Sequence, residues 1–323
     1  MGNIYQKILS KKGFILGLSP MEGITDTVFR QVLCKIGKPD VFFTEFLNVE
    51  GFCSKGKEDV SHRLLFRDIE RPIVFQLWGN VPEFYAKTIK EIRELKPDGI
   101  DINMGCSVRD VLSSGRGSAL INDKILSNEI IQAVKENSKG IPVSVKTRIG
   151  FDKIQTEDWI GFLLEKDLDL LTVHGRLSKE NYSTPCRWDE IKRAVSLRDS
   201  MNSKTLILGN GDIRNIKQAK EYGKNFGVDG VLIGRAILSN PWLFSDDSKR
   251  RMGMITKKER LMTLSEHLRI FIKEKGELDI FNSQKKYIKA YISNFDTASD
   301  LRELLMNSNS VEEAFSILSR RDI

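Results

Sequence analysis

The segment from Asp101 to Ile121, DINMGCSVRDVLSSGRGSALI, contains the residues whose types and spacing are best suited to chemistry. Its apolar run ends at Gly105, and Cys106 follows directly, ahead of several serines, arginines and glycines. A thiol has an ordinary pKa of about 8.5, so it holds a usable proton at neutral pH. Free cysteines are also common as small buried apolar residues, but the polar stretch after Cys106 favours a reactive thiol.

Polar and charged residues also stand at or near the ends of the other short apolar runs. Lys146 is the most informative, because it lies inside the run PVSVKTR and an ammonium group is costly to bury in a dry core. We therefore predict that Lys146 faces a pocket that holds a partner; a structural ion pair is the alternative. The candidate residues at these run ends are Pro20, Met21, Glu22, Gln76, Asn103, Lys146, Arg148, His174, Arg176, Asn210, Gly211, Asp212, Gly234 and Arg235.

Two of these run ends are rich in glycine, namely LGNGDI and IGRAIL. Glycine allows a backbone to approach a ligand closely, and the first amide groups of a helix can bind phosphate. Arg235 would add positive charge at the same place. We predict a phosphate site here, although tight turns between strands and helices also require glycine.

Short apolar runs alternate with helical patterns up to about residue 245. The runs are mostly continuous Val, Ile, Leu and Phe, which is typical of parallel strands buried on both faces. Eight strand-plus-helix units predict an α/β fold, a (β/α)8 barrel, which usually needs ~250 residues and carries its functional groups at the C-terminal strand ends. A doubly wound open sheet is the alternative, but its Gly-rich fingerprint does not follow the first run. The predicted strands span 14–19, 41–46, 73–78, 99–104, 142–148, 170–175, 205–210 and 230–235.

Helical patterns fill the segments between these runs. Val28, Val32 and Ile36 share one helical face, and Gly37 can end that helix. From about residue 246 only amphipathic helical patterns remain. We therefore predict a barrel domain over residues 1–245 and a small all-helical domain over residues 246–323.

The chain has a net charge of +7 and a pI of about 9.1. This balance fits either an acidic partner such as nucleic acid or a generally lysine-rich composition. The helical tail contains the basic runs KRR (249–251), KK (257–258) and KKYIK (285–289). Tyr287 and Tyr291 lie in or beside the last run, and we expect at least one of them to be a core residue.

Several classes of protein are not expected from the sequence. No run of ~18 apolar residues indicates a membrane span, and the N-terminal segment lacks the apolar core of a secretory signal. The four cysteines are widely spaced and the three histidines are far apart, so neither disulfides nor a metal site is expected. We expect a cytoplasmic protein.

Taken in order, the segments SPMEGITDTVFR, FQLWGN, DINMGC, VSVKTRIG, VHGR, GNGDI and GVDGVLIGRAILSNPWLF resemble the tRNA-dihydrouridine synthase family over nearly the whole chain. The resemblance implies a flavin-binding barrel followed by a helical, RNA-binding domain. It also implies an enzyme that uses FMN and NADPH to reduce the C5–C6 double bond of particular uridines in tRNA. We expect a monomer with tRNA as its partner.

The resemblance also assigns roles to the matching residues. Cys106 would give a proton to uracil C5 as a general acid, and Lys146 would lie near N1 and O2 of the flavin, where negative charge develops. His174 would lie beside the flavin. Asn103 and Arg176 are expected on the substrate side. The remaining flavin contacts would be Pro20, Met21, Glu22 and Gln76 around the ring, and Asn210, Gly211, Asp212, Gly234 and Arg235 around the phosphate and ribityl chain.

One departure from the family pattern and two other functions remain open. Ser107 stands where the family usually has proline, which would stiffen the turn after the cysteine. A small-molecule FMN oxidoreductase of the dihydropyrimidine or dihydroorotate type would need a similar barrel but not the basic tail. A non-enzymatic RNA-binding protein would not need both Lys146 and Cys106.

Overall fold

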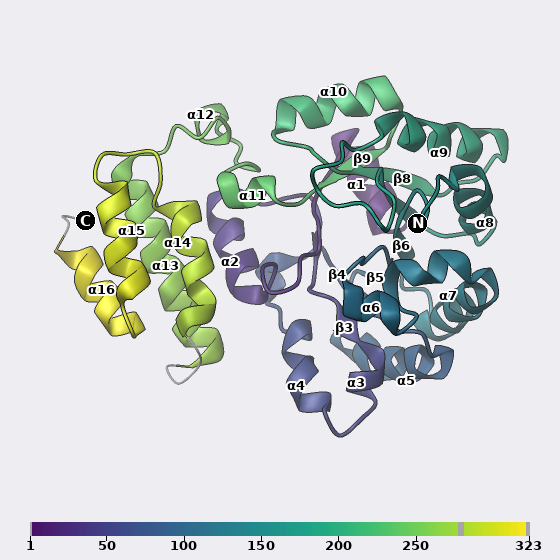
Figure 1. The fold of residues 1–323 in the computed structure, drawn as a ribbon, viewed down its shortest axis with the longest axis horizontal. Coiled ribbons are helices and arrows are strands. Elements are labelled where there is room, and N and C mark those ends of the chain that lie inside the picture. The colour runs from purple at the N-terminus through teal and green to yellow at the C-terminus, as the bar shows by residue number, and fades with distance from the viewer. Residues whose placement is uncertain (1, 277–280, 321–323) are drawn as a thin grey trace. The chain divides into compact units, whose positions relative to one another are not determined.

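The structure, a computed structural model, describes residues 2–276 and 281–320. The chain divides into two compact units (Figure 1). The first consists of residues 1–25 and 40–234, and the second consists of residues 26–39 and 235–323. Each unit is described by itself.

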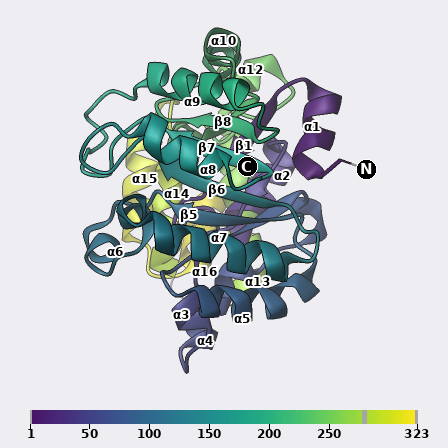
Figure 2. The ribbon, with the colours of Figure 1, turned by 90° about the vertical axis from the view of Figure 1, so that its right-hand side faces the viewer.

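The first unit is built on a nine-stranded, entirely parallel sheet whose strand order is β1-β9-β8-β7-β6-β5-β4-β2, with β3 beside β4. Strands β8, β7, β6 and β5 of this sheet can be followed in Figure 2. A bridge between Gly17 and Val41 joins the two ends of this order, and Leu18 N–H donates to the Val41 carbonyl at 3.2 Å. The sheet is therefore a nearly closed barrel, as predicted, and not an open doubly wound sheet. The strands are β1 (Ile15–Leu18), β2 (Phe42–Phe43), β3 (Leu47–Asn48), β4 (Ile73–Trp78), β5 (Gly99–Met104), β6 (Val143–Arg148), β7 (Leu170–His174), β8 (Leu206–Asn210) and β9 (Gly230–Ile233).

The second predicted strand is the one that differs most from the structure. Instead of one strand over 41–46, the chain forms the two short strands β2 and β3. The break falls at Thr44 and Glu45, whose side chains have other partners: Thr44 Oγ1 donates to the Glu45 carbonyl at 2.7 Å, and the Glu45 carboxylate accepts from Gly23 N–H. A continuous apolar run alone does not reveal such side-chain contacts.

The interior near the beginnings of the strands is apolar and is covered by α1 (Ile4–Lys12). Tyr5 and Ile8 of this helix join a buried cluster with Ile15, Val41, Phe43, Val74, Leu170, Leu208 and Leu232. An Asn3–Gln6 capping box begins the helix, and Gly13 ends it with a φ of 73°, which glycine adopts readily.

Helices connect the strands of the first unit on its outside. α5 packs against α7, and α9 lies beside α8 and α10, as neighbouring barrel helices do (Figure 2). The remaining helices of this unit are α3 (Val49–Phe52), α4 (Lys57–Ser61), α5 (Pro82–Ile92), α6 (Arg109–Ser113), α7 (Lys124–Ser138), α8 (Gly161–Leu164), α9 (Trp188–Ser200) and α10 (Ile216–Phe226).

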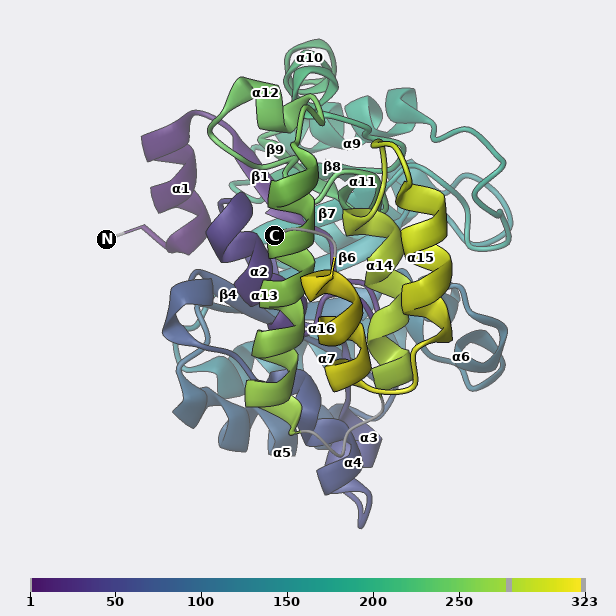
Figure 3. The same ribbon diagram turned by 90° about the vertical axis from the view of Figure 1, so that its left-hand side faces the viewer.

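The second unit is helical and includes a helix from the beginning of the chain. Asp26 caps α2 (Thr27–Ile36), which packs against α13 (Lys257–Lys275) (Figure 3). Phe29 of α2 stacks on Tyr287 with ring centroids 5.0 Å apart. The other helices of this unit are α11 (Ala236–Ser239), α12 (Ser248–Arg251), α14 (Lys285–Tyr291), α15 (Ala298–Asn307) and α16 (Val311–Ser319). The second unit thus begins at residue 235, earlier than the expected boundary at 245, and takes residues 26–39 from the expected barrel segment.

The core of the helical unit contains a neutral histidine. His267 is fully buried, with Nδ1 3.0 Å from the Tyr291 hydroxyl and Nε2 2.8 Å from Gln284 Oε1. Burial lowers the pKa of His267. Tyr287 and Tyr291 are both fully buried, so both are core residues.

No helix in the described part of the chain is both long enough and apolar enough to span a membrane.

Candidate active site

Cys106 lies just after β5 in a turn that is held by hydrogen bonds on both sides. Its N–H donates to Asn103 Oδ1 at 2.9 Å, and its carbonyl accepts from Ser118 N–H at 2.9 Å and Ser118 Oγ at 2.8 Å. Gly117 has a φ of +59°, and a Cβ there would lie 2.7 Å from the Cys106 carbonyl oxygen. The backbone on both sides of the thiol is therefore fixed, and Gly117 makes the close approach possible.

Ser107, which stands where the family resemblance implies a proline, is tied to Arg148 at the end of β6. Arg148 donates to the Ser107 hydroxyl at 2.9 Å, to the Gly105 carbonyl at 2.8 Å and to the Leu177 carbonyl at 2.8 Å. A guanidinium group has several donors in a rigid plane, so one side chain can brace the backbone at several points. Arg148 thus links the cysteine turn to the loop that follows β7.

An open cleft of about 780 Å³ lies beside this turn. The thiol itself is partly exposed. Cationic groups on the cleft wall would favour an anionic ligand, and Tyr182 is 61% exposed. The lining residues are Ser107, Arg109, Leu112, Ser113, Arg148, Ser178, Lys179, Glu180, Asn181 and Tyr182.

The protonation states near the thiol follow from burial and from neighbouring charges. Burial raises the pKa of Cys106, while the Val108 backbone and the Arg148 and Lys146 cations act in the opposite direction. The pKa of Lys146 is lowered to about 8, because burial and the Arg148 cation lower it more than Asp101 raises it. A thiol with a raised pKa stays protonated at neutral pH and can therefore give up a proton as an acid.

Lys146 projects from the middle of β6, in register with Asn103 on β5 and Thr172 on β7. Gln76 on β4 is fully buried and accepts a hydrogen bond from Asn103 Nδ2 at 3.0 Å. Within residues 2–276 and 281–320, the buried polar side-chain atom left without a hydrogen-bond partner is Thr172 Oγ1. An orphaned hydroxyl beside Lys146 is what a site built for a polar ligand would contain.

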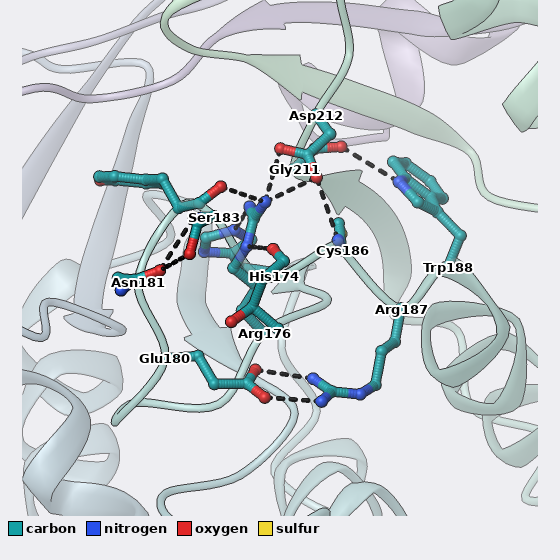
Figure 4. A network of polar contacts seen from close by, with 12 residues as sticks. His174, Arg176, Glu180, Asn181, Ser183, Cys186, Arg187, Trp188, Gly211 and Asp212 are labelled. Carbon is teal, nitrogen blue, oxygen red and sulfur yellow. Dashed lines mark hydrogen bonds and ion pairs between the residues drawn. The ribbon is translucent and has the colours of Figure 1, made fainter.

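A second polar cluster lies at the ends of β7 and β8 (Figure 4). Arg176 is 1% exposed and forms two hydrogen bonds to the Asp212 carboxylate, at 2.7 and 2.6 Å. It also donates to the Thr184 carbonyl at 2.6 Å and lies 3.2 Å from His174 Nε2. Arg176 therefore organises the loop after β7, and its expected contact with substrate stays a prediction.

The same cluster explains why glycine follows β7 and β8. A Cβ at Gly175 or Gly211 would lie 2.6 or 2.5 Å from the Cys186 sulfur. Burial raises the pKa of Cys186 to about 12. Trp188 Nε1 donates to the Gly211 carbonyl at 3.1 Å (Figure 4). Cys186 is thus a packed, protonated thiol that fixes two backbone segments.

The other predicted flavin residues occupy the loops after β1, β8 and β9. Met21 Sδ lies 3.7 Å from the Cβ position of Gly234, so the first and last of these loops meet. Glu22 is ion-paired with Arg63, and Asn210 Nδ2 donates to the Leu232 carbonyl at 2.8 Å. Pro20 is buried after β1, and Arg235 is an exposed residue that precedes α11 in the second unit.

Sequence reasoning did not assign roles to Asp101, Ser107, Ser118 and Thr172. Asp101 is fully buried, and burial raises its pKa to about 6. Asp101 could have been recognised from the sequence, because an acidic residue inside an apolar run is buried and a buried carboxylate needs hydrogen-bond partners. Short serines and threonines gave no signal, because their partners are distant in sequence. Among the described residues, no group of His, Cys, Asp and Glu side chains could hold a metal ion.

Comparisons with known proteins agree with the resemblance found in the sequence. The family model described as dihydrouridine synthase (Dus) matches residues 17–323. A probable tRNA-dihydrouridine synthase of Staphylococcus aureus (strain COL) is 41% identical over 93% of this chain and 91% of its own length. A probable tRNA-dihydrouridine synthase 2 of Bacillus subtilis (strain 168) is 38% identical over 93% of this chain and 92% of its own length.

Among solved structures, morphinone reductase superposes with a TM-score of 0.51 and 11% identity, covering 74% of this chain and 86% of its own. An old yellow enzyme homologue from Zymomonas mobilis gives a TM-score of 0.50 and 13% identity, covering 75% and 89%. At these identities the structural likeness shows the barrel fold alone. The family model and the curated relatives, in contrast, span the turn that carries Cys106, the β-strand ends and the helical tail, and the chain belongs to the dihydrouridine synthase family.

Proposed function

We propose that this protein reduces uridines in tRNA to 5,6-dihydrouridine, with a flavin as cofactor. The observation that carries the proposal is the match to tRNA-dihydrouridine synthases over 93% of the chain. The matched chain contains the turn of Cys106, and Ser107 of that turn lines an open cleft. The small-molecule alternative has no comparable support, because those relatives also match the helical tail.

The residues at the strand ends fit FMN. Lys146 on β6 would supply a cation, and the orphaned Thr172 hydroxyl in register with it supports a ligand with polar ring atoms. Gln76, Pro20, Met21, Glu22 and His174 would hold the ring. Asn210, Gly211, Asp212, Gly234 and Arg235 would hold the phosphate and ribityl chain, where Arg176 offsets the negative charge of Asp212.

The chain's own contribution to the reaction is orientation and a proton. A bound FMN, reduced by NADPH, would supply the hydride for uracil C6. Cys106 gives its proton to C5, and its raised pKa keeps that proton in place until substrate is present. Arg148 and Asn103 hold the turn that carries the thiol, and Asn103 lies on the predicted substrate side.

The helical unit and the basic surface would place the RNA. Lys257, Lys258, Lys286 and Lys289 are exposed on α13 and α14, where they can contact phosphates. The target uridine must leave its stack to reach a cleft of this kind. We expect this reaction in the cytoplasm, carried out by a monomer.

Mass mapping of dihydrouridine in RNA from cells with and without the gene tests the proposal. We expect at least one tRNA uridine to lose its 2 Da mass increase in the deletion strain. A plasmid copy of the gene should restore it, and a Cys106→Ala copy should not. Unchanged tRNA, together with turnover of free uracil or orotate by the purified protein, would contradict the proposal in favour of the small-molecule enzyme.

A further inference from the structure

A chain of hydrogen bonds inside the barrel begins at Asp101 and ends at the backbone of Cys106. Gln76, Asp101 and Ser144 are in register on the neighbouring strands β4, β5 and β6. Asp101 is fully buried, and its two carboxylate oxygens accept from Gln76 Nε2 at 2.6 Å and from Ser144 Oγ at 2.6 Å. A carboxylate can only accept, so the Gln76 amide must turn its nitrogen toward Asp101.

The orientation of Gln76 then determines the orientation of Asn103. With its nitrogen facing Asp101, Gln76 presents Oε1 to Asn103 Nδ2 at 3.0 Å. Asn103 consequently presents Oδ1 to the backbone, where it accepts from Gly105 N–H at 3.0 Å and Cys106 N–H at 2.9 Å. If Gln76 turned over, Asn103 would have to direct an NH2 group at two backbone donors, and the turn would lose both contacts.

The three side chains Asp101, Gln76 and Asn103 are called the Asp101 relay below. We propose that Asp101 is a positioning residue for the Cys106 thiol, acting through the fixed amide orientations of Gln76 and Asn103. The two carboxylate hydrogen bonds of Asp101 go to Gln76 and Ser144, which belong neither to the turn nor to the cleft lining. The inference rests on the proposed function only in giving the thiol its role as proton donor; the geometric claim concerns the turn alone.

Two disruptive substitutions and one conservative substitution test the relay. Asp101→Ala removes its first member, and Gln76→Leu interrupts its middle, so a folding failure in one variant still leaves the other. Asp101→Asn is the rescue, because its oxygen can serve Gln76 while its NH2 group donates to Ser144. Ser144→Ala is the matched control: it takes one hydrogen bond from the same carboxylate without touching the relay.

The first measurement needs no catalysis. The rate of Cys106 alkylation by iodoacetamide is followed by peptide mass spectrometry in the folded holoenzyme. We expect Asp101→Ala and Gln76→Leu to raise the alkylation rate at least about threefold, because a turn without its anchoring hydrogen bonds opens more often. Asp101→Asn and Ser144→Ala should stay within about twofold of the wild type. Equal rates in all the variants would overturn the inference.

The second measurement is dihydrouridine formation on unmodified tRNA. A displaced thiol should lower kcat by about 10–100-fold with little change in KM for tRNA, and Asp101→Asn should recover most of the loss. Equal losses in Asp101→Asn and Asp101→Ala would overturn the relay, since the lost charge would then matter and the amide orientation would not. If the wild-type protein forms no dihydrouridine while Asp101→Ala and Gln76→Leu still alter Cys106 labelling, the proposed function fails and the positioning of the turn stands.

Discussion

At the scale of single residues, the protonation of Lys146 gives the most direct prediction. Its pKa is lowered to about 8, so its charge is present below pH 8 and is lost as the pH rises through that value. The affinity of the flavin-free protein for FMN should therefore fall between pH 7 and pH 9, measured by quenching of flavin fluorescence.

The control for this pH dependence is Lys146→Arg, which keeps its charge throughout the range. In that variant the decline between pH 7 and 9 should disappear. A wild-type affinity that is the same at pH 7 and pH 9 would contradict the placement of the Lys146 cation at the flavin.

The role of a residue could be predicted only where the neighbouring sequence indicates it. Cys106 and Lys146 were recognisable because a thiol and an ammonium group stand in or beside apolar runs. Asp101 stands in such a run too, but its role depends on Gln76, which lies on another strand. Arg176 was expected on the substrate side, and only folding shows that the carbonyls of its own loop and Asp212 surround it.

At the scale of elements, the packing of α2 against α13 and α14 is expected to contribute strongly to the stability of the helical unit. Phe29 is fully buried and stacks on Tyr287. Phe29→Ala should lower the free energy of unfolding of this unit by about 3–5 kcal/mol, measured by urea denaturation. Lys35→Ala on the same helix removes a largely exposed ion pair with Glu266 and should cost less than about 1 kcal/mol. Similar losses in the two variants would show that the buried contact is not the important one.

The lowered pKa of His267 predicts that the helical unit loses stability in acid. Because its folded pKa is lowered, its stabilising contribution is complete above its unfolded pKa and declines as the pH falls below that value. The melting temperature should therefore drop between pH 7 and pH 5, as followed by circular dichroism. His267→Gln, which cannot titrate, should show a smaller drop over the same range. An equal drop would assign the effect to other groups.

The strands were predictable because continuous β-branched and apolar runs are a strong local signal, and apart from the run at 41–46 no strand bound differs by more than two residues. The run at 41–46 was an exception, because the partners of Thr44 and Glu45 divide it. The helix α2 was predicted from Val28, Val32 and Ile36, but its grouping with the C-terminal helices was not. An amphipathic pattern shows that a face is buried without showing what covers it.

At the scale of the whole molecule, the distribution of positive charge predicts which surface contacts RNA. Lys286→Gln combined with Lys289→Gln should weaken tRNA binding and reduce the salt dependence of log K by about 1–2. The exposed lysines Lys217 and Lys220 on α10 provide the control, because their replacement by Gln changes the net charge equally. Filter binding measures the tRNA affinity of both double variants between about 50 and 200 mM salt, the range over which phosphate contacts weaken. Equal effects would mean that total charge, and not the helical unit, determines the affinity.

The central claim is that a Cys106 thiol completes the reduction of a tRNA uridine, and single-turnover product formation tests it most directly. Purified protein is loaded with FMN, reduced with NADPH and mixed with unmodified tRNA, and dihydrouridine is quantified by mass spectrometry. The wild type should form dihydrouridine, while Cys106→Ala should retain FMN and form product at least about 100-fold more slowly. Product formation by Cys106→Ala at the wild-type rate would contradict the account.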